Sequence, residues 1–119
     1  MVCHMENRSW KVFVDGASSA MGADVEIDII TPEGIRLEHS FRLGSKASNN
    51  EAEYEALIAG LKTAFDLGAR DMEVYLDSRL VVNQVQGSFK ARDSRMKEYL
   101  KVVKLIMAKF STTSVTKVA

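Results

Sequence analysis

The stretch that most constrains the fold is a long amphipathic helix with a clear start signal, between Ser48 and Phe65. Ser48 and Glu51 have the spacing of a capping box, in which each side chain accepts a hydrogen bond from the other residue's backbone N–H. The apolar residues that follow at helical spacing are Tyr54, Leu57, Ile58, Leu61, Ala64 and Phe65. Because such a helix buries one face, the rest of the chain must supply a layer that covers it.

Two features of this helix concern its surroundings. The small residues Ala56, Ala59 and Gly60 allow another element to pack very close to it. Glu53 lies one position before the apolar face begins. We therefore expect the Glu53 carboxylate at the rim of the core, held by the helix but still reachable by solvent and by a substrate.

Apolar patterning predicts five strands, at 10–15, 25–30, 35–43, 72–77 and 112–118. The first is mostly apolar, as is typical of a central strand buried on both faces. It should end in a small-residue turn over 15–19, which would let backbone approach a ligand closely. In the third strand, Ile35, Leu37 and Phe41 should point inward.

Two further helices are predicted in the second half of the chain. One covers Leu80 to Val85 and is closed by Gly87, and the other starts at the N-cap residue Asp93. The apolar face of the latter consists of Met96, Tyr99, Leu100, Val103, Ile106, Met107 and Phe110. The order βββαβααβ predicts an α/β layer fold in which the fourth and fifth strands run parallel to the first.

Composition excludes several classes of protein. Sixteen basic and sixteen acidic residues cancel, so no overall field attracts nucleic acid or membrane, and a nucleic-acid partner must be gripped by a local patch. No apolar run approaches the length of a membrane span, and the single cysteine, Cys3, fits a reducing, intracellular compartment. We expect residues 1–9 to be a tail or a cloning remnant and residues 10–119 to form one domain.

Three acidic residues are predicted to converge. Asp15 and Asp77 end two strands expected to be parallel, so both should lie at the same edge of the sheet, where ligands of open α/β sheets bind. Glu53, at the start of the covering helix, can face the same point. Such carboxylates would raise one another's pKa values unless a hard divalent cation, Mg²⁺ or Mn²⁺, relieved the repulsion. A lone aspartate at a strand end is usually only a turn or cap residue, so the convergence is what matters.

Local sequence sharpens this prediction through three motifs: Val-Asp-Gly-Ala-Ser-Ser at 14–19, Asn-Asn-Glu-Ala-Glu-Tyr-Glu-Ala-Leu at 49–57 and Leu-Asp-Ser-Arg-Leu-Val at 76–81. Their order and intervals resemble the acidic motifs of the ribonuclease H family, above all those of plant retrotransposon polyproteins. The resemblance runs from about Trp10 to Val118. It implies a five-stranded mixed sheet in the order 3-2-1-4-5 with helices on both faces. It also implies an endonuclease that cuts the RNA strand of RNA–DNA hybrids.

The resemblance further implies roles for individual residues. In the family an Asp-Glu-Asp-Asp set holds two Mg²⁺ ions, and Asp15, Glu53 and Asp77 match its first three members. These three residues would be both metal-binding and catalytic, with Mn²⁺ as an alternative ion. The substrate contacts that the resemblance suggests are Ser18, Asn49, Asn50, Ser78, Lys90 and Arg92, with Lys46 as a further phosphate contact.

The chain departs from the family pattern at several points. The family's fourth aspartate lies on a last helix after the fifth strand, and this chain ends at Ala119, before that position. We therefore expect weak binding of the second ion, slow or absent cutting, and an uncovered sheet surface that favours dimers. Glu26 and Asp28 stand where the family usually has small or apolar residues. The link over 87–93 is too short for the basic protruding helix of some members, so affinity for a hybrid should be modest and salt-dependent.

Other interpretations remain open at this point. The chain could be a non-catalytic ribonuclease H-like module that binds a hybrid or a protein partner, or a related metal-dependent exonuclease. The parent protein could also carry a covalently linked reverse transcriptase. Asn49 and Asn50 fit a helix start as well as a substrate contact, and Ser78 fits an N-cap. The default interpretation of Lys97, Lys101 and Lys104 is a solvated helix face.

Overall fold

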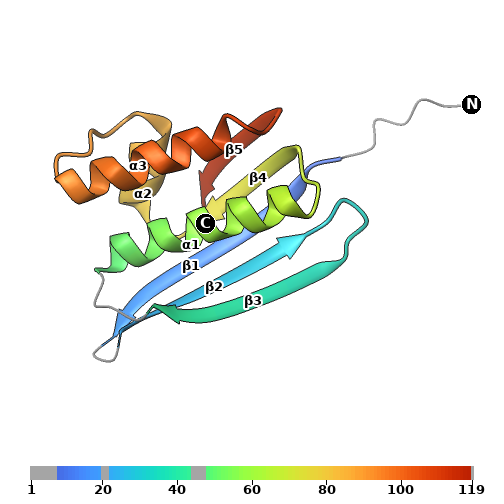
Figure 1. The fold of residues 1–119 in the computed structure, drawn as a ribbon, viewed down its shortest axis with the longest axis horizontal. Helices are drawn as coiled ribbons and strands as arrows, with labels where there is room; N and C mark the ends of the chain where they lie inside the picture. Colours follow the sequence, from blue (N-terminus) through green and yellow to red (C-terminus); the bar gives the residue numbers. More distant parts are fainter. Residues whose placement is uncertain (1–7, 20–21, 44–47, 119) are drawn as a thin grey trace, which may run out of the picture.

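The computed structural model describes residues 8–19, 22–43 and 48–118 (Figure 1). The elements are β1 Trp10–Ser19, β2 Gly22–Ile30, β3 Arg36–Leu43, α1 Asn49–Asp66, β4 Asp71–Leu76, α2 Arg79–Gln86, α3 Ser94–Met107 and β5 Thr112–Lys117. The strands form one sheet in the order β3-β2-β1-β4-β5. β2 is antiparallel to both β1 and β3, whereas β4 is parallel to β1 and β5 is parallel to β4. The predicted strand order and strand directions are confirmed.

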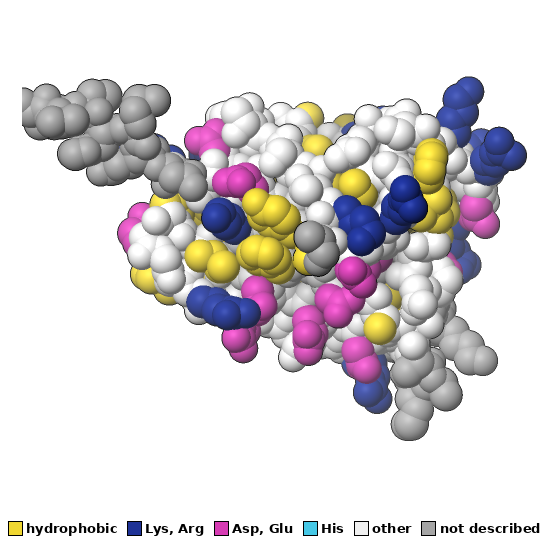
Figure 2. Space-filling view, turned by 180° about the vertical axis from the view of Figure 1, so that it is seen from behind, with side chains coloured by type: hydrophobic (Ala, Val, Ile, Leu, Met, Phe, Trp, Pro, Cys, Tyr) yellow, Lys and Arg dark blue, Asp and Glu magenta, His cyan; other side chains and the backbone are white. Residues whose placement is uncertain are grey.

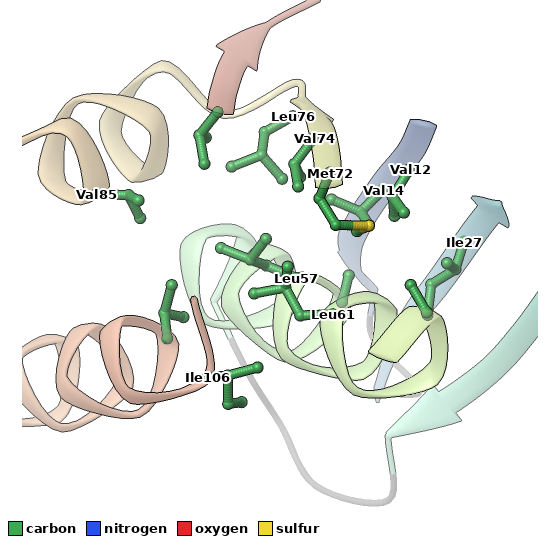
Figure 3. Packing of buried hydrophobic residues seen from close by; sticks show 14 of the residues in the cluster. Val12, Val14, Ile27, Leu57, Leu61, Met72, Val74, Leu76, Val85 and Ile106 are labelled. Carbon is green, nitrogen blue, oxygen red and sulfur yellow. The ribbon is translucent and has the colours of Figure 1, made fainter. Parts of the chain in front are cut away.

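The core lies between the sheet and α1, which crosses β1 and β2 (Figures 1 and 3). Its central members are Val12, Val14, Ile27, Leu57, Leu61, Val74 and Leu76, all buried. Gly60 permits the close approach: a Cβ atom there would lie 3.0 Å from a methyl carbon of Val12. The predicted capping box is present, since Ser48 Oγ accepts from the Glu51 N–H at 3.1 Å and Glu51 Oε1 accepts from the Ser48 N–H at 3.0 Å.

The other two helices complete the same layer. α2 begins at the N-cap Ser78 and ends at Gly87, whose φ of 89° is a left-handed conformation suited to glycine. α3 packs against α1, where the rings of Tyr54 and Tyr99 stack with centroids 5.5 Å apart. The Tyr54 hydroxyl also donates to Gln84 Oε1 at 2.6 Å, and both residues are buried. This polar link between α1 and α2 was not predicted, because the apolar pattern of α2 does not distinguish Gln84 from an exposed residue.

Two predictions about the strands were wrong. β1 does not turn after Asp15 but continues to Ser19, because the small residues there pair with β2 as far as Gly22. In and beside β3, Ile35 and Leu37 are exposed by 57% and 39%, although Phe41 does pack against the core. The predicted alternation of inward and outward side chains along β3 was right. The inward residues are nevertheless exposed, because α1 covers β1 and β2 and leaves this edge strand largely open.

The opposite face of the sheet carries none of the three helices in the described part of the chain (Figure 2). Phe13 and Tyr75 stack on it with ring centroids 4.7 Å apart. A band of acidic side chains crosses the same face (Figure 2). The resemblance implies helices on both faces of the sheet. The helices of the described residues form a single layer on one face. Within the described residues, no helix is both long and apolar enough to cross a membrane. Residues 1–7, including Cys3, and Lys46 lie outside the described residues.

Candidate active site

The structure brings Asp15 and Asp77 to the same part of the sheet. Val14 is the register partner of Leu76 in the parallel pair of β1 and β4, so the next residue of each chain segment is an aspartate. Both aspartates are exposed, and both line one shallow pocket of about 240 Å³. The predicted convergence of the two strand-borne carboxylates is therefore present.

Glu53 reaches this point from α1, and Gly16 makes its position possible. A Cβ atom on Gly16 would lie 2.5 Å from the backbone carbonyl of Ala52 and 2.7 Å from the backbone nitrogen of Glu53. Only a glycine lets α1 come so close to β1. Gly16 belongs to the segment over 15–19 where we expected backbone to approach a ligand closely, and the close neighbour of Gly16 in the structure is the helix itself.

Glu53 is more deeply buried than predicted, with 3% of its surface exposed. Burial, with a smaller contribution from the negative charges of Asp15 and Asp77, raises the pKa of Glu53 to about 7. The backbone N–H groups of Asp77 and Gly16 act in the opposite direction and stabilise its ionised form. Glu53 therefore lies between the two strand ends, and its charge is costly when nothing neutralises it.

The donor set suits a hard divalent cation. Glu53 Oε1 is buried and has no hydrogen-bond partner, which is unusual for a carboxylate oxygen. Among the described residues, no lysine or arginine forms an ion pair with Asp15, Glu53 or Asp77. The described part of the chain does not hold three acidic or imidazole groups in a ready-made coordination shell. The unpartnered Glu53 oxygen and the all-oxygen donor set are what favour Mg²⁺ or Mn²⁺ over softer metals.

Replacing Glu53 by glutamine is expected to stabilise the metal-free protein at pH 8. The pKa of Glu53 in the folded state, about 7, exceeds the ordinary value of 4.5. Between these two pH values the folded state therefore binds more protons than the unfolded state, so the protein loses stability as the pH rises. The gain for Glu53→Gln should be on the order of 2 kcal/mol above pH 7 and should vanish near pH 4.5. Urea unfolding in EDTA at pH 5 and pH 8 measures it.

Glu98→Gln is the matched control for this measurement, because Glu98 is an exposed glutamate on α3. Its effect on the free energy of unfolding should be small and should not follow the same pH course. Equal stabilities of wild type and Glu53→Gln at pH 8 would contradict the buried, charge-strained state of Glu53.

The two asparagines that begin α1 bind the neighbouring strand ends. Asn49 Oδ1 accepts from both the N–H and the hydroxyl of Ser18, at 2.7 and 2.8 Å. Asn50 Oδ1 accepts from the Ser78 hydroxyl at 2.9 Å, while Ser78 Oγ accepts from the Val81 N–H as the N-cap of α2. Since a backbone N–H is always a donor, the Asn49 side-chain atom that faces Ser18 must be the carbonyl oxygen.

The predicted basic contacts lie elsewhere. Lys90 and Arg92, on the link between α2 and α3, line a pocket of about 610 Å³ with Phe89 and Met96. Neither residue lines the pocket of Asp15 and Asp77. Lys97, Lys101 and Lys104 line a second depression, and Lys90 borders both it and the pocket of Arg92.

Two residues of the acidic pocket, Glu26 and Asp28, were not assigned a role in advance. Glu26 lines the pocket with Asp15, Asp77 and Asp28, because β2 pairs with β1 at this height. The sequence marked Glu26 as a departure from the family pattern but offered no account of it. The register of β2 against β1 would have placed Glu26 in this pocket, but that register depends on where the β1–β2 hairpin turns.

Comparison with known proteins points to one family. Residues 14–119 match the sequence pattern of the family described as Reverse transcriptase-like. Ribonuclease HI of Halobacterium salinarum is 32% identical over 109 residues, which cover 89% of this chain and 54% of that protein. The chain thus spans about half the length of this curated relative.

Solved structures agree with the strand order and the helix layer described above. RNase H1 from the halophilic archaeon Halobacterium salinarum has a TM-score of 0.86 at 32% identity, covering 92% of this chain and 85% of that one. LC11-RNase H1, isolated from compost and solved in complex with an RNA/DNA hybrid, has a TM-score of 0.82 at 28% identity, covering 92% and 85%. Both are ribonucleases H by name, and both share this fold with the chain.

Proposed function

This chain belongs to the Reverse transcriptase-like family of ribonuclease H folds, and from that membership we propose that it is a metal-dependent endonuclease that hydrolyses the RNA strand of RNA–DNA hybrids. The observation that carries the proposal is that Asp15, on β1, and Asp77, directly after β4, line one pocket, while the neighbouring Glu53 of α1 has a buried oxygen that lacks a partner. A similar protein, LC11-RNase H1, has been solved with an RNA/DNA hybrid.

Asp15, Glu53 and Asp77 would hold two divalent cations, Mg²⁺ or Mn²⁺, which when bound supply the Lewis-acid and water-activating chemistry of phosphodiester hydrolysis. The two aspartates are exposed and face incoming substrate, whereas Glu53 is buried behind them. Because a carboxylate must be ionised to act as a ligand, Glu53 would have to give up its proton to hold a cation. Loading of the site should therefore strengthen as the pH rises toward about 7.

The asparagines would position the hybrid. Asn49 and Asn50 use their carbonyl oxygens to bind Ser18 and Ser78, which fixes the start of α1 against β1 and α2. The amide NH₂ groups of both side chains would donate to acceptors of the hybrid, such as 2′-hydroxyls and base edges in the minor groove. Lys90 and Arg92 would contact phosphates farther along the hybrid, from their separate groove.

We expect the 119 residues on their own to cut slowly. Three of the four carboxylates that the resemblance implies lie among them, so the second ion should bind weakly. A covalently linked reverse transcriptase in the parent protein is part of the same proposal.

The proposal is tested by incubating the protein with an RNA–DNA hybrid whose RNA strand is labelled. Cleavage is expected to require Mg²⁺ or Mn²⁺, to be confined to the RNA strand, and to be absent for RNA–RNA and DNA–DNA duplexes of the same sequence. Mn²⁺ should give the higher rate, because it tolerates imperfect coordination better. Cleavage that persists in EDTA would contradict the metal-dependent mechanism.

A binding assay distinguishes the proposed endonuclease from a non-catalytic module that binds the hybrid. If the folded protein binds the hybrid but cuts it with neither ion, the non-catalytic module is the better description. If it neither binds nor cuts the hybrid, a protein partner becomes the remaining alternative.

A further inference from the structure

β3 lies at one edge of the sheet, and no further strand of the described chain pairs with its outer side (Figure 1). Residues 35 to 40 are all exposed. Leu37 opposes the buried Ile29 of β2 and so belongs to the face that packs against α1, yet 39% of its surface is exposed. An edge strand with unpaired backbone groups and exposed apolar side chains is a template for pairing with another strand.

On its other face, β3 brings a carboxylate against the acidic strand β2. Glu38 is the register partner of Asp28, and directly opposed like charges destabilise a strand pair. Arg36 donates to Asp28 at 2.8 Å, and its Nε atom lies 3.5 Å from Glu38, whose side chain is 72% exposed. Glu38 and Asp28 also line a hollow of about 380 Å³ with Glu26, and no lysine or arginine of the described chain lines it. The charge of Glu38 is therefore open to a cation that approaches from beyond the edge.

Arg42, near the other end of β3, is such a cation. Its Nε atom donates to Asp24 of β2 at 2.8 Å, and the guanidinium group has further N–H donors for a second carboxylate. Glu38 and Arg42 lie on the same face of β3, on either side of Ser40 and equally far from it in the sequence. When two β3 strands pair antiparallel about Ser40, Glu38 of each copy therefore opposes Arg42 of the other.

Other registers of this pairing are less favourable. A pairing centred on Glu38 sets this carboxylate against its own copy, and one centred on the next residue sets Arg36 against Arg42. A centre one position before Glu38 joins only residues 36 to 38 of the strand, and a centre one position after Ser40 pairs no opposite charges within β3. A centre between two residues sets the apolar face of one copy against the charged face of the other. Ser40 is thus the centre that joins opposite charges over most of the strand.

We propose that β3 pairs with β3 of a second copy of this chain, antiparallel and about a twofold axis at Ser40. Residues 37 to 43 are paired in this register, and Leu37 gains Leu43 of the other copy as an apolar neighbour. The contact is self-complementary, as the twofold symmetry of a dimer requires. Because a strand pair is a small interface, we expect association in the micromolar range.

The dimer goes beyond the proposed function and leaves the acidic pocket open. Ser40 lies opposite Glu26, which in turn lies opposite Asp15, so the twofold axis is two strands away from Asp15. Since neighbouring strands are about 4.8 Å apart, the two Asp15 residues would lie roughly 24 Å apart on the same face of the extended sheet.

Disulfide trapping tests the register. In a Cys3→Ser background, Ser40→Cys treated with oxidised glutathione should give a covalent dimer, because directly opposed Cα atoms lie about 4.5–5.5 Å apart, a distance that a disulfide spans. Arg36→Cys is the matched control on the same exposed face of β3, since its two copies would lie roughly 27 Å apart. It should stay monomeric on a denaturing gel. Equal trapping of both variants would indicate random collision and overturn the proposal, and so would the absence of trapping in Ser40→Cys.

Charge reversal tests the ion pairs. Sedimentation equilibrium from micromolar to millimolar protein should show a wild-type dimer that Glu38→Arg weakens at least about tenfold, because arginines then oppose each other twice. Glu98→Arg makes the same change of charge on the exposed side of α3 and should stay within about twofold of wild type. Glu38→Arg should melt no lower than wild type, since it removes the carboxylate opposite Asp28.

Three results would overturn the role of β3. They are a wild-type monomer at every concentration, a dimer that Glu38→Arg leaves unchanged, and an equal loss in Glu98→Arg, which would mark a general charge effect. None of them bears on cleavage of a hybrid, so the proposed function is tested separately.

Discussion

An Asp15→Asn variant is expected to lose at least about 10³-fold in cleavage of an RNA–DNA hybrid while keeping its fold, which corresponds to on the order of 4 kcal/mol of transition-state stabilisation. Asp15 lies between Glu53, Asp77 and Glu26. A cation held at this site would therefore contact the Asp15 carboxylate or one of these three neighbouring carboxylates. An amide keeps the shape of the side chain and removes the charge. Single-turnover cleavage in Mg²⁺ and in Mn²⁺ measures the loss.

Asp24→Asn is the control for a general charge effect. Asp24 lies on the same face of the sheet, but its carboxylate is paired with Arg42 at 2.8 Å and does not line the Asp15 pocket. Its cleavage rate should stay within about twofold of wild type. Asp15→Asn should not lower the melting temperature in EDTA, because it removes a charge that opposes the ionisation of Glu53. Substantial cleavage remaining in Asp15→Asn would mean that a contaminant or another site cuts the hybrid.

Local signals predicted the elements well because their causes are local. The capping box of Ser48 and Glu51 determines where α1 begins, and Gly87 determines where α2 ends, whatever the rest of the chain does. The parallel pairing of β1 and β4 follows from the order of the elements, and it brings Asp15 and Asp77 together. The two strand-borne acids of the site could therefore be predicted from sequence alone.

Features that depend on contact between distant elements were the ones predicted wrongly or not at all. Glu53 was expected at an accessible rim, but the depth of α1 depends on the missing Cβ of Gly16, a residue of another element. The exposure of Leu37 depends on how far α1 extends across the sheet, and the place of Glu26 depends on the hairpin register. Periodicity identifies which face of an element is apolar, and it carries no information on how closely or how far a partner covers that face.

A Gly16→Ala variant should therefore damage both the fold and the site. The added Cβ would lie 2.5 Å from the carbonyl carbon and oxygen of Ala52, and backbone atoms of a capped helix cannot move aside as a flexible side chain can. We expect a loss of about 3 kcal/mol in the free energy of unfolding, with a fall in melting temperature of roughly 10 °C. Displacement of α1 would also carry Glu53 away from Asp77 and weaken Mn²⁺ binding.

Gly60→Ala provides the comparison that isolates this cause. Gly60 lies in the same interface of α1 with β1, but its added Cβ would meet methyl groups of Val12 and Val14 at 3.0 and 3.2 Å. Side chains can give by a few tenths of an ångström, and alanine favours a helix over glycine by up to about 1 kcal/mol. The two terms oppose each other, so Gly60→Ala should stay within about 1 kcal/mol of wild type in urea unfolding. If Gly16→Ala is as mild as Gly60→Ala, the backbone contact of β1 with α1 does not place Glu53, and the raised pKa of Glu53 needs another cause.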